Sequence, residues 1–368
     1  MEDERYIACS ATKTTICRMI SEPLYLDHAA TTPLLPAARD AMAAGFAHWA
    51  NPSSPHRPGR AARAALEDAR ERVRSALGWG GELIFTSGAS EAIGIALTRA
   101  VQPLGAVSAV EHEAVLRHAG DAVRLAVDDM GAVDPAAQLP AALVAIQHVN
   151  NETGVIQPLD AIASSVRAAE GLLLADCAQG AGKLDLPDAD LIAISAHKFG
   201  GPVGVGALLV RDWAMLRPLG GQERGYRPGT ENLPAAMAMA AALEAGRGWL
   251  EEASRLRVLL EEAIREAGGV VIAQDAPRVA TIGACRMPGI SAAAQLIRFD
   301  GMGIAVSAGS ACSSGSLRTS HVLAAMGLED RAAAEVIRVS IGRETDEADI
   351  LRFVAAWRDI AARGRAAA

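Results

Sequence analysis

A lysine stands at the point where an apolar run gives way to a glycine-rich loop. The run Leu191–Ile194 predicts a buried strand, and it is followed by Ser195, Ala196, His197 and Lys198. A lysine in apolar surroundings loses solvation, so its neutral amine becomes accessible near neutral pH and can form a Schiff base. Ser195 and His197 carry groups that can hydrogen-bond an anion such as phosphate. A plain surface lysine is the competing interpretation, and this stretch alone does not decide between the two.

A second stretch has the pattern of an anion-binding turn. The apolar run Leu83–Phe85 leads into the turn TSGASE, residues 86–91, and an apolar helix begins near Ala92. The unpaired N–H groups at a helix N-terminus and the helix dipole both favour phosphate. The alternative is an ordinary helix that is capped by Ser87 or Ser90.

Polar side chains follow four successive predicted strands. The strands and the residues that follow them are Ala106–Val110 with His112, Ala142–Val149 with Asn151, Leu172–Ala175 with Asp176, and Leu191–Ile194 with Lys198. Helical segments between these strands indicate an α/β fold with a mostly parallel sheet. Ligands bind beyond the carboxyl ends of the strands in such sheets, so we expect one site assembled from several loops.

Helices and a second domain are expected around these strands. Helical spacing predicts one helix from the turn-rich residues 51–60 to about Leu77 and another at about 158–169. A long helical stretch is expected at about 235–266, after a segment rich in Gly, Arg and Pro. The tail, residues 270–360, has shorter elements and indicates a smaller α+β domain.

Cys312 lies in a run of small residues, VSAGSACSSGS, residues 306–316. Such a run cannot pack a core, and a cysteine in an exposed loop is accessible enough to react. A passive cysteine in a linker is the alternative. Cys177 and Cys285 are predicted to be core filler and a strand residue without a partner, and no metal-ligand spacing connects the five cysteines.

Composition narrows the class of protein. The chain has 368 residues, 51% of them hydrophobic, and a formal net charge of −8, which argues against a nucleic-acid partner. No apolar run approaches the ~20 residues of a membrane span. The odd number of cysteines fits a reducing compartment, and we expect a cytoplasmic protein. The polar composition of residues 1–22 predicts a poorly ordered leader, and translation could start at either Met1 or Met19.

The combination of these groups suggests pyridoxal phosphate (PLP). This cofactor needs a lysine for its aldehyde, a phosphate cradle, and a carboxylate that keeps the pyridine nitrogen protonated. His112 has a ring that could stack on the pyridine. A reactive cysteine on a separate loop suggests chemistry at the far end of the substrate, beyond simple transamination.

The chain resembles the cysteine desulfurases, in the class V aminotransferase branch of the fold-type I PLP enzymes. The resemblance runs from about Tyr25 to the C-terminus and rests on ten segments in the same order, which makes it highly specific. The segments are YLDHAATTP, NPSSPH, FTSGASEA, EHEAVL, VNNETGVIQP, DCAQ, SAHKFGGPVGVGAL, RPGTENLP, SAGSACSSGS and IRVSIGR.

The resemblance implies a role for each matching residue. Lys198 would carry the cofactor, Cys312 would be the nucleophile, and Arg338 would bind the substrate carboxylate. His112 would stack on the ring and assist proton transfer. The remaining implied contacts are Asp176 to the pyridine nitrogen, Gln179 and Asn151 to the region of the phenolic oxygen, Ala89 (backbone), Ser90, Ser195 and His197 to the phosphate, and Thr230 to the phosphate of the other subunit of a homodimer.

The resemblance also implies an architecture and an activity. Residues 36–250 would form the large PLP-binding domain around a seven-stranded, mostly parallel sheet. Residues 23–35 and 251–368 would form the small domain with the Cys312 loop. L-cysteine would become L-alanine, and a persulfide on Cys312 would supply sulfur to an iron–sulfur scaffold or to tRNA thiolation; Cys312 is also a candidate transient cluster ligand.

The sequence is also compatible with other functions. A selenocysteine lyase or an aminotransferase has the same fold, and a non-catalytic scaffold for sulfur assembly is an alternative of another class. The sequence departs from the family pattern at Ile93 and Gly94, where Asn pairs are frequent, and at His28, where many relatives have Asn. These departures affect substrate preference and partner surfaces more than the core chemistry.

Overall fold

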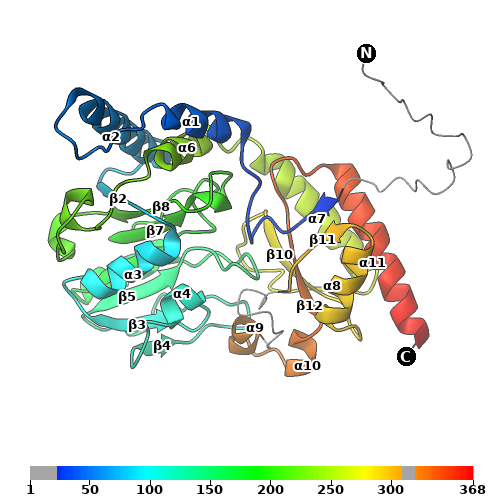
Figure 1. Cartoon of the computed structure of the whole chain (residues 1–368). Helices are drawn as coiled ribbons and strands as arrows, with labels where there is room; N and C mark the ends of the chain where they lie inside the picture. The colour runs from blue at the N-terminus through cyan, green and yellow to red at the C-terminus, as the bar shows by residue number, and fades with distance from the viewer. Residues whose placement is uncertain (1–22, 309–319, 368) are drawn as a thin grey trace, which may run out of the picture.

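A seven-stranded sheet forms the centre of the larger part of the molecule (Figure 1). The computed structural model describes residues 23–308 and 320–367, so the leader 1–22 and Cys312 lie outside the described residues. The strands run across the sheet in the order β2-β8-β7-β6-β5-β3-β4. Their bounds are Glu82–Thr86 (β2), Leu104–Ser108 (β3), Val123–Leu125 (β4), Leu143–Gln147 (β5), Leu172–Asp176 (β6), Leu191–Ser195 (β7) and Gly206–Val210 (β8).

Most neighbouring strands of this sheet are parallel. Strands β4, β3, β5, β6 and β7 pair in parallel, whereas β8 is antiparallel to both β7 and β2. The expected α/β fold with a mostly parallel sheet is confirmed. The strand expected at Ala142–Val149 is shorter than predicted, because Val149 leaves the sheet and forms a bridge with Ile156. The parallel strands place their carboxyl ends at one edge, where the predicted polar residues follow.

Helices cover both faces of the sheet. Successive residues of a strand point to opposite faces; in β7, Ile192 and Ile194 join one core cluster, and Leu191 and Ala193 join another. The first cluster contains residues of the helices Pro36–Phe46 (α1), Arg57–Leu77 (α2), Leu159–Ala168 (α5) and Leu233–Glu244 (α6). The second contains residues of Ala89–Arg99 (α3) and Glu113–Leu116 (α4).

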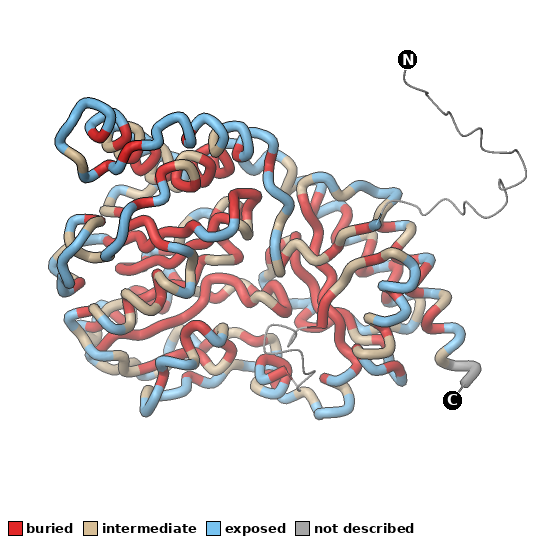
Figure 2. Tube along the Cα trace, in the orientation of Figure 1, coloured by how far each residue is buried: buried red, intermediate tan, exposed pale blue. Residues whose placement is uncertain are grey.

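This two-sided cover explains why the strands are continuous apolar runs in the sequence. Figure 2 shows the central strands buried and the outer sides of the helices exposed. Among the residues that the structure describes, no helix combines the length and the hydrophobicity that crossing a bilayer requires.

The rest of the chain forms a smaller α+β arrangement beside the large sheet (Figure 1). Its antiparallel sheet has the order β12-β10-β9, and a separate parallel pair joins β1 to β11. The bounds are Leu24–Tyr25 (β1), Val270–Val271 (β9), Ile282–Arg286 (β10), Ile304–Ala305 (β11) and Val336–Ser340 (β12), with helices Leu250–Glu266 (α7), Ala292–Gly301 (α8), His321–Ala325 (α9), Asp330–Ala333 (α10) and Glu347–Ala367 (α11).

Aromatic rings fill the core of this smaller part. Phe299 of α8 stacks on Phe353 of α11 at 5.0 Å between ring centroids, and Trp357 lies beside both. Residues of β1, β11 and β12 belong to the same cluster. The N-terminal segment therefore packs with C-terminal elements, in keeping with the predicted domain division at 23–35, 36–250 and 251–368, which stays a prediction.

The helical stretch expected at 235–266 is two helices, so the prediction of one stretch was wrong. Helix α6 ends at Glu244 and α7 begins at Leu250. Gly246 between them has φ = 73°, in the left-handed region that glycine tolerates and a continuing helix cannot use. The break brings Trp249 to the start of α7, next to the reactive-lysine segment described below.

Candidate active site

A cavity of about 420 Å³ lies at the carboxyl ends of the parallel strands. It collects residues from the turn before α3, from the ends of β5, β6 and β7, and from β12. The residues that were predicted as site residues and that line it are Ala89, Ser90, His112, Asn151, Asp176, Gln179, Ser195, His197, Lys198 and Arg338. Loops far apart in the sequence thus meet at one place, as the strand ends predicted.

The turn before α3 has the geometry of an anion cradle. Gly88 occupies the N-cap position with φ = 156°, and no side chain caps the helix. The alternative interpretation, an ordinary helix capped by Ser87 or Ser90, is therefore wrong. A Cβ on Gly206 would lie 2.7 Å from Gly88 Cα, so β8 also needs glycine to let the turn approach. The first N–H groups of α3 remain available for an anion.

Lys198 lies in the single turn Ala196–Lys198 (η1) that follows β7. Its Nζ donates to the carbonyl oxygens of Ala29 at 2.7 Å and Ala30 at 2.8 Å. The side chain is half-buried and lines the cavity. These two carbonyl groups hold the amine at the mouth of the parallel strands, which is the position that the sequence predicted for a reactive lysine.

Asp176 ends β6 inside the cavity. Its Oδ1 accepts a hydrogen bond from the backbone N–H of Ala178 at 2.9 Å. Burial raises the pKa of this carboxyl above its ordinary value, while the Ala178 N–H and the charges of His112 and Lys198 oppose that rise. A cationic ring nitrogen beside Asp176 would favour its ionised form further.

His112 is fixed by the start of α4. Its Nδ1 accepts a hydrogen bond from the backbone N–H of Ala114 at 3.1 Å, so in the neutral ring the proton is on Nε2. Burial lowers the pKa of His112 from its ordinary value, and the nearby Asp176 carboxylate opposes this shift. The ring is therefore neutral near pH 7, which suits stacking on a cofactor ring.

Arg338 is almost fully buried, at 2% exposure, on β12. Its Nη2 donates to Asp27 Oδ1 at 2.8 Å, and its Nη1 donates to the carbonyl of Asn151 at 3.0 Å. Its Nε has no hydrogen-bond partner among the described residues. A guanidinium held in this way presents a fixed cationic fork to the cavity, which matches the predicted carboxylate-binding role.

Gln179 and His197 complete the wall around Lys198. Gln179 Nε2 donates to the carbonyl of Ala29 at 2.8 Å. His197 Nδ1 lies 3.2 Å from Thr31 Oγ1, and burial lowers the pKa of His197 to about 4. His197 is therefore neutral near pH 7 and offers a hydrogen bond rather than a charge.

Three polar residues near the site were missed by the sequence analysis. Glu111 is fully buried, and its Oε1 accepts from the backbone N–H of Gln147 at 2.8 Å. Burial raises the pKa of Glu111 well above its ordinary value. Gln147 lines the cavity, and Lys183 lies buried behind Gln179. Glu111 could have been found because it directly follows the predicted strand Ala106–Val110, and Gln147 because it is a polar residue within the apolar run Ala142–Val149.

One predicted site residue does not line the cavity, and another lies outside the described residues. Thr230 is exposed, in the segment between Glu223–Gly225 (η3) and α6, and does not line it. Cys312 lies outside the described residues. Within the described ranges, no group of three His, Cys, Asp or Glu side chains is arranged to hold a metal ion. Cys177 is buried, which agrees with its prediction as core filler, and Cys285 is buried in β10.

The residues of the cavity fit PLP. The uncapped N-terminus of α3, together with Ser90, Ser195 and His197, matches a phosphate. The Lys198 amine could react with the aldehyde, Asp176 could pair with the ring nitrogen, and His112 could stack on the ring face. This fit depends on the donors present and on the uncapped helix, and each of these groups points to a different part of the cofactor.

Comparison with known proteins agrees with this site. Residues 24–353 match the family described as aminotransferase class-V. A cysteine desulfurase of Gluconacetobacter diazotrophicus is 36% identical over 365 residues, covering 90% of this chain and 91% of that protein. A cysteine desulfurase IscS of Anaeromyxobacter sp. is 37% identical, covering 89% and 90%. The solved structure of a NifS-like protein matches with a TM-score of 0.85 at 29% identity, covering 93% of this chain and 100% of that one. The chain belongs to the PLP-dependent class V aminotransferase family and groups there with the cysteine desulfurases.

Proposed function

We propose that this protein is a cysteine desulfurase, which converts L-cysteine to L-alanine and leaves a persulfide on Cys312. The observation that carries the proposal is the convergence of Lys198, Asp176, His112 and Arg338 on one cavity. A plain aminotransferase needs the first three groups as well, but it has no use for a nucleophilic thiol. The residues that would hold the cofactor are Ala89, Ser90, His112, Asn151, Asp176, Gln179, Ser195, His197 and Lys198.

Each residue of the cavity has a separate role in the proposed reaction. PLP, when bound, supplies an electron sink that stabilises negative charge at the substrate Cα. Arg338 binds the substrate carboxylate and fixes the orientation of the Cα–H bond. The Lys198 amine takes up the α-proton, and neutral His112 holds the ring face and relays protons through Nε2. Asp176 keeps the ring nitrogen protonated, since an ionised carboxylate stabilises the adjacent cation.

The sulfur step belongs to Cys312. Its thiolate attacks the substrate sulfur, so an S–S bond forms and the substrate C–S bond breaks. The electron pair of the C–S bond stays with carbon, which takes up a proton and leaves as alanine. The sulfur removed from the substrate remains on Cys312 as a persulfide, which a thiol acceptor can then take.

A comparison of Cys312→Ala with the wild type tests this proposal. The purified protein is incubated with L-cysteine while PLP absorbance, alanine and sulfide are measured. We expect the variant to keep the cofactor absorbance and to form no alanine. Cys285→Ala is the matched control, because burial raises the pKa of that thiol to about 12 and makes it a poor nucleophile. Alanine formation by Cys312→Ala would contradict the desulfurase mechanism, and cofactor binding without alanine in either protein would point to another amino-acid substrate.

The same proposal extends to partners and location. We place the protein in the cytoplasm as a homodimer that passes sulfur to an iron–sulfur scaffold or to tRNA thiolation, and the IscS name of one relative supports the first route. The exposed position of Thr230 supports a contact with the phosphate of a second subunit. Thr230→Ala is expected to weaken PLP binding in the dimer, as measured by a fluorescence titration alongside the oligomeric state.

A further inference from the structure

Lysine is rare in this chain, and its placement is selective. Of the 35 lysines and arginines, only three are lysines: Lys13, Lys183 and Lys198. Arginine stays charged at any accessible pH, whereas the amine of a buried lysine can lose its proton. Almost every cationic residue of this chain is thus an arginine, yet position 183 is a lysine, and this residue is only 7% exposed.

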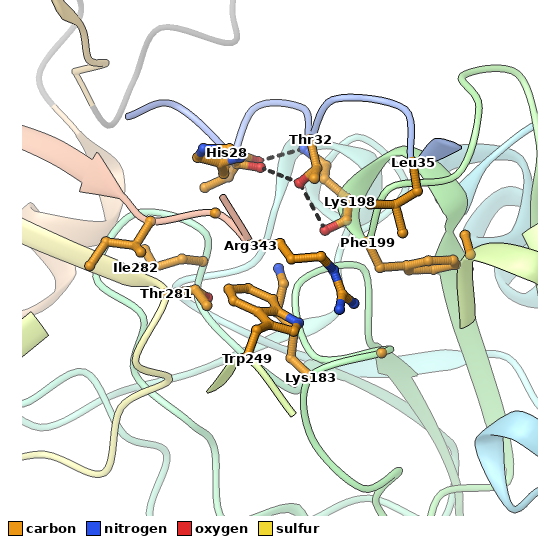
Figure 3. Close-up of a pocket in the computed structure, with 15 residues that line it drawn as sticks. His28, Thr32, Leu35, Lys183, Lys198, Phe199, Trp249, Thr281, Ile282 and Arg343 are labelled. Carbon is orange, nitrogen blue, oxygen red and sulfur yellow. Dashed lines mark hydrogen bonds between the residues drawn. The ribbon is translucent and has the colours of Figure 1, made fainter. Parts of the chain in front are cut away.

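Lys183 and Lys198 line the same small cavity. Figure 3 shows both among the side chains around it, together with Trp249 and Arg343. The cavity has a volume of about 20 Å³, which is room for one water molecule. Lys198 and Ala29 line this cavity and also the larger one. Lys183 therefore lies behind the reactive lysine, outside the set of residues that line the larger cavity.

A chain of hydrogen bonds connects the two amines. Lys183 Nζ donates to Gln179 Oε1 at 3.4 Å, and Gln179 Nε2 donates to the carbonyl of Ala29 at 2.8 Å. The same carbonyl accepts from Lys198 Nζ at 2.7 Å. Because a carbonyl oxygen can only accept, Gln179 must turn its NH₂ group toward Ala29 and its oxygen toward Lys183. By donating to the oxygen, Lys183 stabilises this orientation of an amide that also lines the larger cavity.

The charges around Lys183 are positive or neutral. Lys198 faces it from η1, Arg343 from the segment after β12, and His28 from the segment after β1. The described residues that line the cavity include no carboxylate. Burial, and then the charge of Lys198, lower the pKa of Lys183 to about 7. Burial also lowers the pKa of His28 to about 4, so that ring is neutral beside the amine at neutral pH.

We propose that Lys183 is a positioning residue for Lys198, which orients Gln179 and takes up or releases a proton as the charge on Lys198 changes. Two ammonium groups whose shared cavity has no carboxylate among its described lining residues repel each other, so a proton on one disfavours a proton on the other. The Asp176 carboxylate acts on Lys198 from the larger cavity. When Lys198 loses its charge, Lys183 takes up a proton, and the net charge of the pair is kept near one. The proposal rests on the proposed function, in which Lys198 is the amine that carries the cofactor.

Selective NMR of the lysine side chains tests the titration directly. The full chain is labelled with ¹³Cε-lysine, and the signals are assigned with Lys13→Arg and Lys183→Met. We expect Lys183 to titrate near pH 7, and we expect Lys198→Met to move its midpoint upward by about one pH unit, since a like charge is removed. A midpoint for Lys183 near the ordinary lysine value of about 10.4, or one that Lys198→Met leaves unchanged, would overturn the proposal.

A second measurement uses the protein with PLP bound. The pH dependence of the cofactor absorbance is compared in the wild type, Lys183→Met, Lys183→Gln and Lys183→Arg. We expect a higher midpoint in Lys183→Met and Lys183→Gln and no rise in Lys183→Arg, which keeps the positive charge; circular dichroism checks that each variant is folded. Coincident midpoints in folded variants count against the proposal. A wild type that binds no PLP would instead contradict the proposed function, while the NMR titration would still test Lys183.

Discussion

The guanidinium of Arg338 donates to the carboxylate of Asp27 at 2.8 Å, although the two residues are 311 positions apart in the sequence. Asp27 follows β1, and Arg338 lies in the middle of β12. The backbone carbonyl of Asn151 accepts from the same guanidinium at 3.0 Å. One buried side chain therefore joins the first strand, the loop after β5 and the last strand, and it faces the cavity where substrate would bind.

Arg338→Lys is expected to weaken substrate binding more than turnover. A lysine keeps the charge but loses the planar fork, so KM for L-cysteine should rise at least about tenfold. Steady-state kinetics with alanine detection gives KM and kcat separately, and PLP absorbance reports whether the cofactor site survives. Arg358→Lys is the matched control, because that exposed arginine pairs with Glu266 on the surface, away from the cavity. An unchanged KM in Arg338→Lys would show that the substrate carboxylate binds elsewhere.

Gly88→Ala is expected to weaken PLP binding without unfolding the protein. The φ of 156° at Gly88 is costly for any residue with a Cβ, and the turn would have to move away from the phosphate position. If this strain of about 1–3 kcal/mol must be met when PLP binds, the loss of affinity is roughly 5- to 150-fold. Fluorescence titration with PLP measures this loss. Gly80→Ala is the control, since a Cβ at that position would meet open space. Equal PLP affinities for the two variants would show that the conformation at Gly88 does not contribute to phosphate binding.

Glu111 should make the stability of the protein depend on pH. Burial raises its pKa well above the ordinary value of 4.5, so the folded state holds a proton that the unfolded chain releases. The contribution to the free energy of unfolding is complete below pH 4.5 and is lost as the pH rises through the folded-state pKa. Urea unfolding between pH 5 and 8 should therefore show a flatter pH profile for Glu111→Gln than for the wild type. Glu113→Gln, at an exposed position, should leave the wild-type profile unchanged; identical slopes in all three proteins would refute the shift.

A buried ion pair anchors the segment that leads to Thr230. Both Arg70 nitrogens Nη1 and Nη2 donate to Glu223, at 2.8 and 3.1 Å, and Glu223 also accepts from the backbone N–H of Phe85 at 3.0 Å. Glu223→Ala removes the bidentate partner of this buried guanidinium, which keeps only its contacts with Glu67 and with the Leu83 carbonyl. The variant should therefore lose about 3 kcal/mol of unfolding free energy. Urea denaturation measures this. Asp359→Ala, which breaks an exposed pair with Arg363, should change stability far less; a similar loss in both variants would argue against the anchor.

The strand ends were the most predictable part of the molecule. The central strands β5, β6 and β7 are buried on both faces, so the sequence of each is an apolar run that ends at a polar residue. His112, Asn151, Asp176 and Lys198 were found in this way, and the cavity contains all four. The chemistry of the site therefore followed from local sequence alone, because the topology of a parallel sheet fixes where those ends meet.

Features that depend on tertiary contacts were harder to predict. The sequence around Ser87 and Ser90 fits a capped helix as well as an open one, and only the glycine conformation at position 88 distinguishes them. The helix break at Gly246 was missed because the apolar pattern continues on both sides of it. Lys183 was missed for another reason: nothing in its neighbourhood in the sequence indicates that it packs behind a lysine 15 positions later.

The pairing of β1 with β11 has a consequence for how the enzyme is made. Leu26 and Ala29, which are synthesised first, depend on partners that are synthesised last: Leu26 N–H donates to the carbonyl of Ala305 at 2.9 Å, and Ala29 N–H donates to Ser340 Oγ at 2.9 Å. The carbonyl groups that hold Lys198 belong to this segment. On the ribosome, the large sheet can form before the Ala29 and Ala30 carbonyl groups are fixed in place to accept hydrogen bonds from Lys198. The site matures only after the C-terminal strands emerge, so cofactor capture is an event of the finished chain, and a nascent chain that stops before β12 would carry the sheet without a working site.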